Sequence, residues 1–71
     1  MKPQYSFKKT GETNKGWPEY GVSLRGSGQL LGYAKHRREN DWYIVVEGFE
    51  FNFRRREECA AALHIAYLLK G

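Results

Sequence analysis

The chain has a single cysteine, and its apolar residues never form a long run. One cysteine excludes an internal disulfide and a four-cysteine metal site, which fits a reducing compartment. The apolar runs are far too short to span a bilayer, and the first residues lack the apolar core of a secretion signal. We therefore expect a cytoplasmic protein that does not associate with membranes.

Catalytic and metal-binding patterns are also missing from the sequence. A nucleophile needs a base and an orienting group that converge on it, and no such set can be recognised. His36, His64 and Cys59 lack the spacing of metal ligands, and residues 26–28 lack the lysine and helix that follow a phosphate-binding loop. We expect no enzymatic activity, no catalytic residue, no metal site and no cofactor.

Positive charge is what the chain has in excess. Twelve Lys and Arg residues stand against eight Asp and Glu residues, which gives a net charge of +4 and a pI near 9.4. The cations are clustered in the sequence, at residues 8–9, 35–38 and 54–56. Such an excess favours a polyanionic partner, usually nucleic acid, although a small domain can carry the same charge for solubility alone.

The strongest fold signal lies between residues 42 and 53. Two alternating apolar segments, residues 42–46 and 49–53, flank Glu47 and Gly48. Gly accepts the positive φ of a tight hairpin turn, so the pattern predicts a β-hairpin. Side chains alternate along a strand, so three facing pairs share one side of the sheet: Trp42 with Phe53, Ile44 with Phe51, and Val46 with Phe49. We expect the segment that follows to cover this face.

That following segment is predicted to be a helix from about residue 55 to residue 69. Glu57 and Glu58 suit its first turn, and Gly71 suits its end. Its apolar stripe is expected to face the sheet and consists of Cys59, Ala62, Leu63, Ala66 and Leu69.

The first half of the chain predicts two more strands. Residues 20–24 alternate and form the first, and residues 29–35 form the second, with Leu31 and Tyr33 on its buried side. Residues 36–41 are expected to form a charged loop, and residues 1–16 a flexible arm. The predicted fold class is α+β: a small antiparallel sheet of three to four strands packed on one C-terminal α-helix. Residues 17–71 then form a single β-β-β(-β)-α domain.

In this arrangement the uncovered side of the hairpin presents Tyr43, Val45, Glu50 and Asn52. The basic residues at 35–38 and at 54–56 both flank the Trp42–Phe53 pair, so we expect the two clusters to converge as a phosphate-binding rim. The arginine stems at 54–56 have an alternative role, which is to cover the core and solvate the helix start.

Three strands followed by one packing helix resemble the DNA-binding domains of ethylene-responsive factors and the amino-terminal arm-site domains of tyrosine integrases. The matching residues lie between 20 and 68: Tyr20-Gly21-Val22, Phe53, Glu57-Glu58-Cys59-Ala60-Ala61-Ala62 and Ala66. In those families the sheet enters the major groove, and side chains on its open face contact bases. The resemblance implies base contacts by Arg25, Tyr43 and Asn52, and phosphate contacts by Lys35, Arg37, Arg38, Arg54, Arg55 and Arg56. A weaker resemblance, through Pro18-Glu19-Tyr20 and the basic start of an Ala-rich helix, is to double-stranded-RNA-binding domains.

Two functions follow from these patterns. The first is a small nucleic-acid-binding accessory protein, phage- or plasmid-borne, that binds duplex DNA through the basic rim and the open sheet face. The alternative is a protein-interaction module, an inhibitor or adaptor of a host protein. Its contact surface would be Tyr33, Tyr43 and Val45 on the sheet, or Ile65 and Leu68 on the helix. A homodimer through a free strand edge, at residues 29–35 or at the first predicted strand, is a further possibility.

Overall fold

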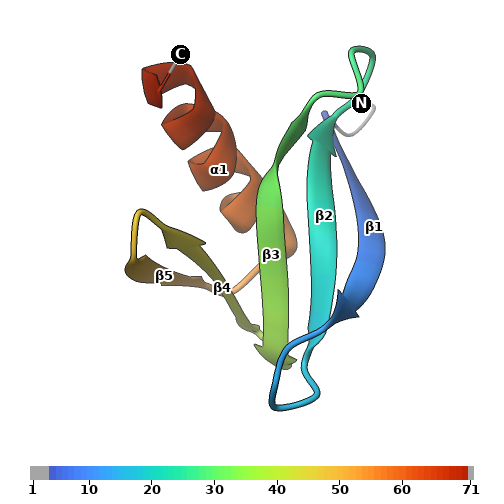
Figure 1. Ribbon diagram of the computed structural model, residues 1–71, viewed down its shortest axis with the longest axis vertical. Helices are drawn as coiled ribbons and strands as arrows, with labels where there is room; N and C mark the ends of the chain where they lie inside the picture. Colours follow the sequence, from blue (N-terminus) through green and yellow to red (C-terminus); the bar gives the residue numbers. More distant parts are fainter. Residues whose placement is uncertain (1–3, 71) are drawn as a thin grey trace.

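The computed structural model describes residues 4–70 and contains a five-stranded antiparallel sheet with one helix packed on it (Figure 1). The elements are β1 (Tyr5–Glu12), β2 (Pro18–Leu24), β3 (Leu30–Arg38), β4 (Asp41–Val46), β5 (Phe49–Phe53) and α1 (Arg56–Lys70). The strands lie in the sheet in chain order, β1-β2-β3-β4-β5. The predicted α+β class is confirmed, but the sheet has five strands rather than three to four.

The additional strand, β1, occupies most of the segment that was predicted to be a flexible arm. It pairs with β2 from Tyr5↔Leu24 to Glu12↔Pro18. Tyr5 and Phe7 pack against the core, and the Tyr5 hydroxyl lies 3.0 Å from Nδ1 of His64. Two aromatic residues at alternating positions are enough to hold this strand, although the polar residues after them hide the pattern in the sequence. The part of the predicted arm before residue 4 lies outside the described residues.

The β4–β5 hairpin has the predicted register, with Trp42↔Phe53, Ile44↔Phe51 and Val46↔Phe49 as partners. Both turn residues have positive φ, 51° at Glu47 and 85° at Gly48, as a primed two-residue turn requires. The expected burial of this face holds for Phe53, which packs against the core, but is wrong for Phe49 and Phe51, because α1 packs mainly on β3 and β4. Phe49 therefore stays 70% exposed and Phe51 47% exposed.

The predicted charged loop at residues 36–41 is also wrong. Strand β3 continues to Arg38 and β4 begins at Asp41, so the connection is a tight turn in which Asn40 has a φ of 60°. These charged residues are compatible with a strand because their long stems can lie on the surface of the sheet while the charged ends reach water.

Tyr33 was predicted to be buried, but it is exposed and its neighbour Ala34 is fully buried. The reason is a bulge: Val22 pairs with Gly32 and Ser23 pairs with Leu30, which leaves Leu31 as an extra residue in β3. One extra residue reverses which side chains face the core beyond it.

The core lies between the middle of strands β2, β3 and β4 and the first half of α1. Its fully buried members are Val22, Ala34, Ile44, Cys59 and Ala60, and Leu63 lies with them. The predicted stripe is confirmed at Cys59 and Leu63, but Leu69 is exposed because the helix extends past the core. Gly71, predicted to end the helix, lies outside the described residues. No helix within residues 4–70 has the length and apolar character needed to cross a membrane.

Strands β3 and β4 separate above their connecting turn (Figure 1). They pair at Lys35↔Tyr43, His36↔Trp42 and Arg38↔Asp41, which all lie near the turn. The diverging strands and the second half of α1 enclose a groove of about 520 Å³. It is lined by Leu31, Gly32, Tyr33, Lys35, Val45, Val46, Glu47, Leu63, Ala66, Tyr67, Leu69 and Lys70.

Candidate nucleic-acid interface

The sheet face that points away from α1, here called the outer face, holds an internal network of cations and aromatic rings. Arg37 donates a hydrogen bond from Nη2 to Oε2 of Glu50 at 2.9 Å. Its guanidinium carbon lies 4.5 Å from the ring centre of Tyr43 and 5.2 Å from that of Trp17. The hydrogen bond to Glu50 raises the pKa of Arg37 above its usual value, so this side chain is a permanent cation. Its charge is already matched by a carboxylate and two aromatic faces.

Lys35, two residues before Arg37 on β3, also contacts a carboxylate and the ring of Tyr43. Its ammonium lies 4.0 Å from Oε2 of Glu19 and 5.8 Å from the ring centre of Tyr43. Tyr43 itself is only 9% exposed, because Lys35, Arg37 and Trp17 surround it. Little of Tyr43 is therefore open to a partner, and Lys35 and Arg37 are paired within the molecule. Their roles in contacting bases and phosphates stay predictions.

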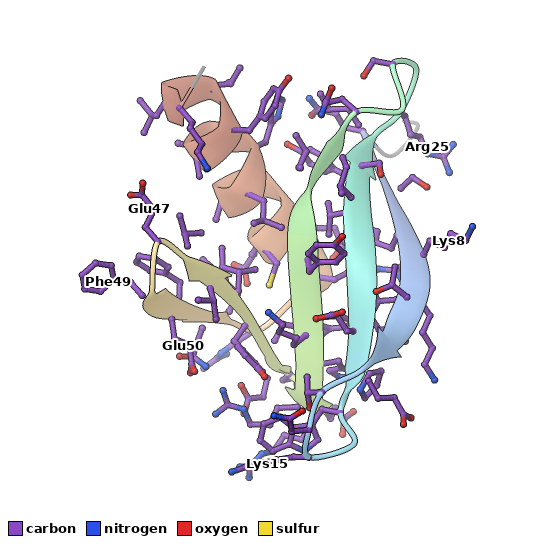
Figure 2. The ribbon with its side chains drawn as sticks, in the orientation of Figure 1. Lys8, Lys15, Arg25, Glu47, Phe49 and Glu50 are labelled. Carbon is purple, nitrogen blue, oxygen red and sulfur yellow. The ribbon has the colours of Figure 1, made fainter. Side chains whose placement is uncertain are left out.

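Asn52 lies beside this network, whereas Arg25 lies apart from it. Asn52 is exposed on β5, the last strand of the sheet, opposite Tyr43. Arg25 follows β2 at the end of the sheet away from the β3–β4 turn (Figure 2). It lines a shallow groove of about 440 Å³ together with residues 4–7, Arg56 and Glu57. Of the three residues expected to contact bases, Tyr43 and Asn52 are thus neighbours on the outer face, whereas Arg25 lies at another end of the sheet.

The arginines at the start of α1 are held by a specific backbone arrangement. Oε1 of Glu58 accepts hydrogen bonds from the amides of Arg54 and Arg55, both at 3.2 Å. A carboxylate at the third helical position that bonds back to the residue before the helix is half of a capping box. This cap fixes the backbone of Arg54 and Arg55, and both side chains are exposed. Within residues 4–70 no carboxylate forms an ion pair with either guanidinium.

Arg56, the first residue of α1, has two partners. Its guanidinium carbon lies 4.8 Å from the ring centre of Phe7, and its Nε lies 3.4 Å from Oε2 of Glu57. The guanidinium of Arg56 thus lies over Phe7, a half-buried residue that packs against the core. Arg54 and Arg55 keep their charged groups exposed.

Three aromatic side chains form a row on the inner face of the sheet, the face that carries α1. Trp42 stacks on His36 with ring centres 4.1 Å apart, and Tyr20 lies 5.5 Å from Trp42 on a tilted plane. All three are half-buried. Trp42 pairs with Phe53, the residue directly before Arg54, so this row lies beside the start of the helix.

Two more cations flank this aromatic row. Lys9 is the sheet partner of Tyr20, and Arg38 follows His36 at the β3–β4 turn. Both are exposed, and each has one weak ion pair, Lys9 with Glu12 at 3.9 Å and Arg38 with Asp41 at 3.5 Å. Exposed ion pairs of this kind contribute little to stability. Breaking them to contact another anion therefore costs little free energy.

We call this region the helix-start surface. It comprises the cations Lys9, Arg38, Arg54, Arg55 and Arg56 around the aromatic row Tyr20, His36 and Trp42. Arg38 lies two residues after His36, which stacks on Trp42, and Arg54 directly follows Phe53, the sheet partner of Trp42. The convergence of the two basic clusters stays a prediction. Sequence reasoning missed Lys9, Tyr20, His36 and Trp42 as members. The alternation of Lys9 with Tyr5 and Phe7 was the available signal, but it required recognising β1 as a strand.

Several other exposed side chains lie on opposite sides of the molecule. Lys8, Lys15 and Arg25 lie along the β1–β2 side and its ends, whereas Glu47, Phe49 and Glu50 lie on the β4–β5 hairpin (Figure 2). The hairpin therefore carries acidic and aromatic side chains, and it lies at the opposite edge of the sheet from β1.

The remaining groups with chemical potential are the thiol of Cys59 and the side chains that could bind a metal ion. Burial raises the pKa of the Cys59 thiol to about 12, so the thiol stays protonated and behaves as a small core residue. In the part of the chain that the structure describes, no three His, Cys, Asp or Glu side chains gather in a way that could hold a metal ion.

Comparison of the chain with protein-family models, with curated proteins and with solved structures finds no match. The antiparallel sheet followed by a C-terminal helix is coarsely like the sheet-plus-helix domains named above. This likeness concerns architecture alone.

Proposed function

We propose that the protein binds nucleic acid, with duplex DNA as the favoured form, through the helix-start surface. The observation that carries this proposal is the pair Arg54 and Arg55. Their backbone is fixed by the Glu58 cap, while their guanidinium groups are exposed and without an ion-pair partner among residues 4–70. Positioned cations of this kind suit phosphate contacts, which orient a protein on a duplex.

The carboxylates nearby do not oppose this function strongly. Glu58 is engaged with two backbone amides, and Glu57 lies 3.4 Å from Arg56. The start of a helix also carries partial positive charge, which favours an anion within the first turn. A phosphate can therefore approach Arg54 and Arg55 without meeting an uncompensated acid.

The aromatic row favours contact with a duplex over single-stranded nucleic acid. Single-strand binders need open aromatic faces on which bases stack. Trp42 has His36 stacked at 4.1 Å and Tyr20 at 5.5 Å, so its ring is already occupied by neighbouring rings. The row then serves as a rigid support for the cations.

Fluorescence anisotropy with labelled mixed-sequence duplex DNA tests this proposal. We expect affinity to fall steeply with salt, because each phosphate contact releases a counterion and adds about 0.9 to the slope of log K against log salt. Replacing both Arg54 and Arg55 by Gln should lower the slope by about 2. The matched control replaces Lys8 and Lys15, two exposed cations elsewhere on the molecule, by Gln and should leave the slope nearly unchanged.

Absence of binding at low salt would overturn the proposal. Equal losses in the two double variants would show that net charge, rather than the helix-start surface, drives association. Single-stranded DNA and duplex RNA as competitors then report which form is preferred.

A protein partner is the second candidate function, and one observation favours it. Ile65 and Leu68 on the outer side of α1 are each more than half exposed. Apolar residues gathered on one helix favour contact with another protein. Replacing Ile65 and Leu68 by Lys should abolish co-purification of a specific partner, whereas the Arg54 and Arg55 variant should retain it.

A further inference from the structure

The two edges of the sheet differ in how they are protected. Sheet edges are open to pairing with another chain, and proteins usually protect them with lysines or bulges. Strand β1 carries Lys8 and Lys9 and has an irregular register between Lys9 and Gly11. Strand β5, with the sequence Phe-Glu-Phe-Asn-Phe, pairs with β4 in a regular register and contains neither lysine nor proline. The β5 edge therefore lacks the protection that β1 has.

The hairpin geometry determines which backbone groups face outward from β5. Val46 and Phe49 close a two-residue turn, so they exchange both backbone hydrogen bonds. Bonded pairs alternate along an antiparallel ladder, so Phe51 and Phe53 also bond to β4. The amide and carbonyl of Glu50 and Asn52 consequently point away from the sheet.

We propose that a second copy of this chain pairs with this edge, β5 against β5, around a two-fold axis at Phe51. In this antiparallel register Glu50 lies opposite Asn52 of the second copy, and the outward backbone groups of the two residues bond to each other. Phe51 then faces Phe51 of the second copy in a non-hydrogen-bonded position, where side chains are closest. Phe49 faces Phe53 on the same side of the joined sheet.

Side-chain chemistry fits this register well. Phe49 and Phe51, which are 70% and 47% exposed, become cross-strand aromatic pairs. Glu50 meets an amide rather than a second carboxylate, and it keeps its bond to Arg37. The arrangement closes as a dimer because each copy presents the same surface to the other.

Neighbouring two-fold registers are less suitable. An axis at Glu50 would place two carboxylates opposite each other, which is destabilising. An axis at Asn52 would require the amide of Arg54 for pairing with Glu50, but that amide bonds Oε1 of Glu58 at 3.2 Å. The axis at Phe51 avoids both conflicts.

Sedimentation velocity over a range of protein concentrations tests the proposal. We expect a reversible monomer–dimer equilibrium for the unmodified protein. Asn52→Pro removes an outward amide without breaking a bond to β4, so it should raise the dissociation constant by about tenfold or more. Val45→Lys is the matched control. Val45 is 48% exposed, like Phe51, but lies one strand away from the edge, so this variant should still dimerise.

Cross-linking identifies the register. Phe51→Cys should form an intermolecular disulfide under mild oxidation, because the two Cβ atoms lie opposite each other in a non-hydrogen-bonded pair. The native thiol, Cys59, is buried and should not react. A protein that stays monomeric at all concentrations would overturn the proposal, as would a dimer that persists unchanged in Asn52→Pro. Circular dichroism establishes that each variant is folded.

Discussion

Gly32 is predicted to determine how closely α1 approaches the sheet. A Cβ atom added at this position would lie 2.8 Å from Cδ2 of Leu63, closer than real Cβ contacts occur. The residue also has a φ of +157°, a backbone conformation that other residues rarely adopt. Gly32→Ala therefore combines overpacking against a core leucine with backbone strain.

The expected cost of Gly32→Ala follows from these two terms. Overpacking typically costs about 1–3 kcal/mol, and an unfavourable backbone conformation adds about 1 kcal/mol. A total of about 2–4 kcal/mol is a large share of the stability of such a small domain. The melting temperature should fall by at least about 8 °C, since domains of this size lose about 4–8 °C per kcal/mol. Urea denaturation and thermal melting both measure the effect.

Three further variants, two at glycines and one at a leucine, separate the cost of overpacking from the cost of backbone strain. Gly11→Ala has open space and no positive φ, so it should cost little. Gly26→Ala has open space but a φ of +93°, so it isolates the backbone term. Leu63→Val removes the δ carbons and should cost about 1 kcal/mol alone, yet it should relieve part of the loss caused by Gly32→Ala. If Gly32→Ala is no more destabilising than Gly11→Ala, the close approach of helix and sheet is refuted.

Three other predictions concern stability. Tyr5→Phe should cost about 1 kcal/mol by removing the hydrogen bond to His64, and a cost near zero in urea denaturation would mean that β1 is not docked on the helix. Glu58→Ala should cost about 1 kcal/mol by removing the cap on Arg55, and thermal melting should detect it. Because the thiol pKa of Cys59 rises from 9.0 to about 12 on folding, the unfolded chain loses this proton first, so stability should fall as pH rises from 9.0 toward 12. This fall amounts to about 1.4 kcal/mol per pH unit, and urea titrations of Cys59→Ala should lack that component.

The sequence predicted local elements well where one signal was strong. The Glu47-Gly48 turn and the alternation on either side of it fixed the β4–β5 register, residue by residue. The helix was predicted within a residue of its bounds, because acidic residues at its start and a helical apolar stripe agreed. These signals depend on neighbours in the chain, so they can be read without a structure.

Long-range contacts explain what the sequence did not predict. Strand β1 is held by Tyr5 and Phe7, whose partners in the helix and sheet lie far away in the chain. The bulge at Leu31 reversed the burial of Tyr33 and Ala34, and nothing in the local pattern marks it. Arg37 looked like part of a free basic cluster, but Glu50 and Tyr43, its partners across the sheet, could not be assigned from spacing.

The free edges of the sheet are a related correction. The strands that were predicted to offer an edge for a homodimer are β2 and β3, and both lie inside the sheet. The edges are β1 and β5. Because β1 pairs with β2, the strands with an unpaired side are β1 and β5.

The proposal that the helix-start surface binds nucleic acid is the central claim, and NMR chemical-shift mapping tests it most directly. The amide and indole signals of the isotope-labelled protein would be followed while unlabelled duplex DNA is added at low salt. The account predicts the largest shifts at Lys9, Arg54, Arg55 and the Trp42 indole, with little change at Tyr33 and Asn52. Shifts concentrated on the outer face, at Tyr33, Lys35 and Asn52, or no shifts at all, would contradict it.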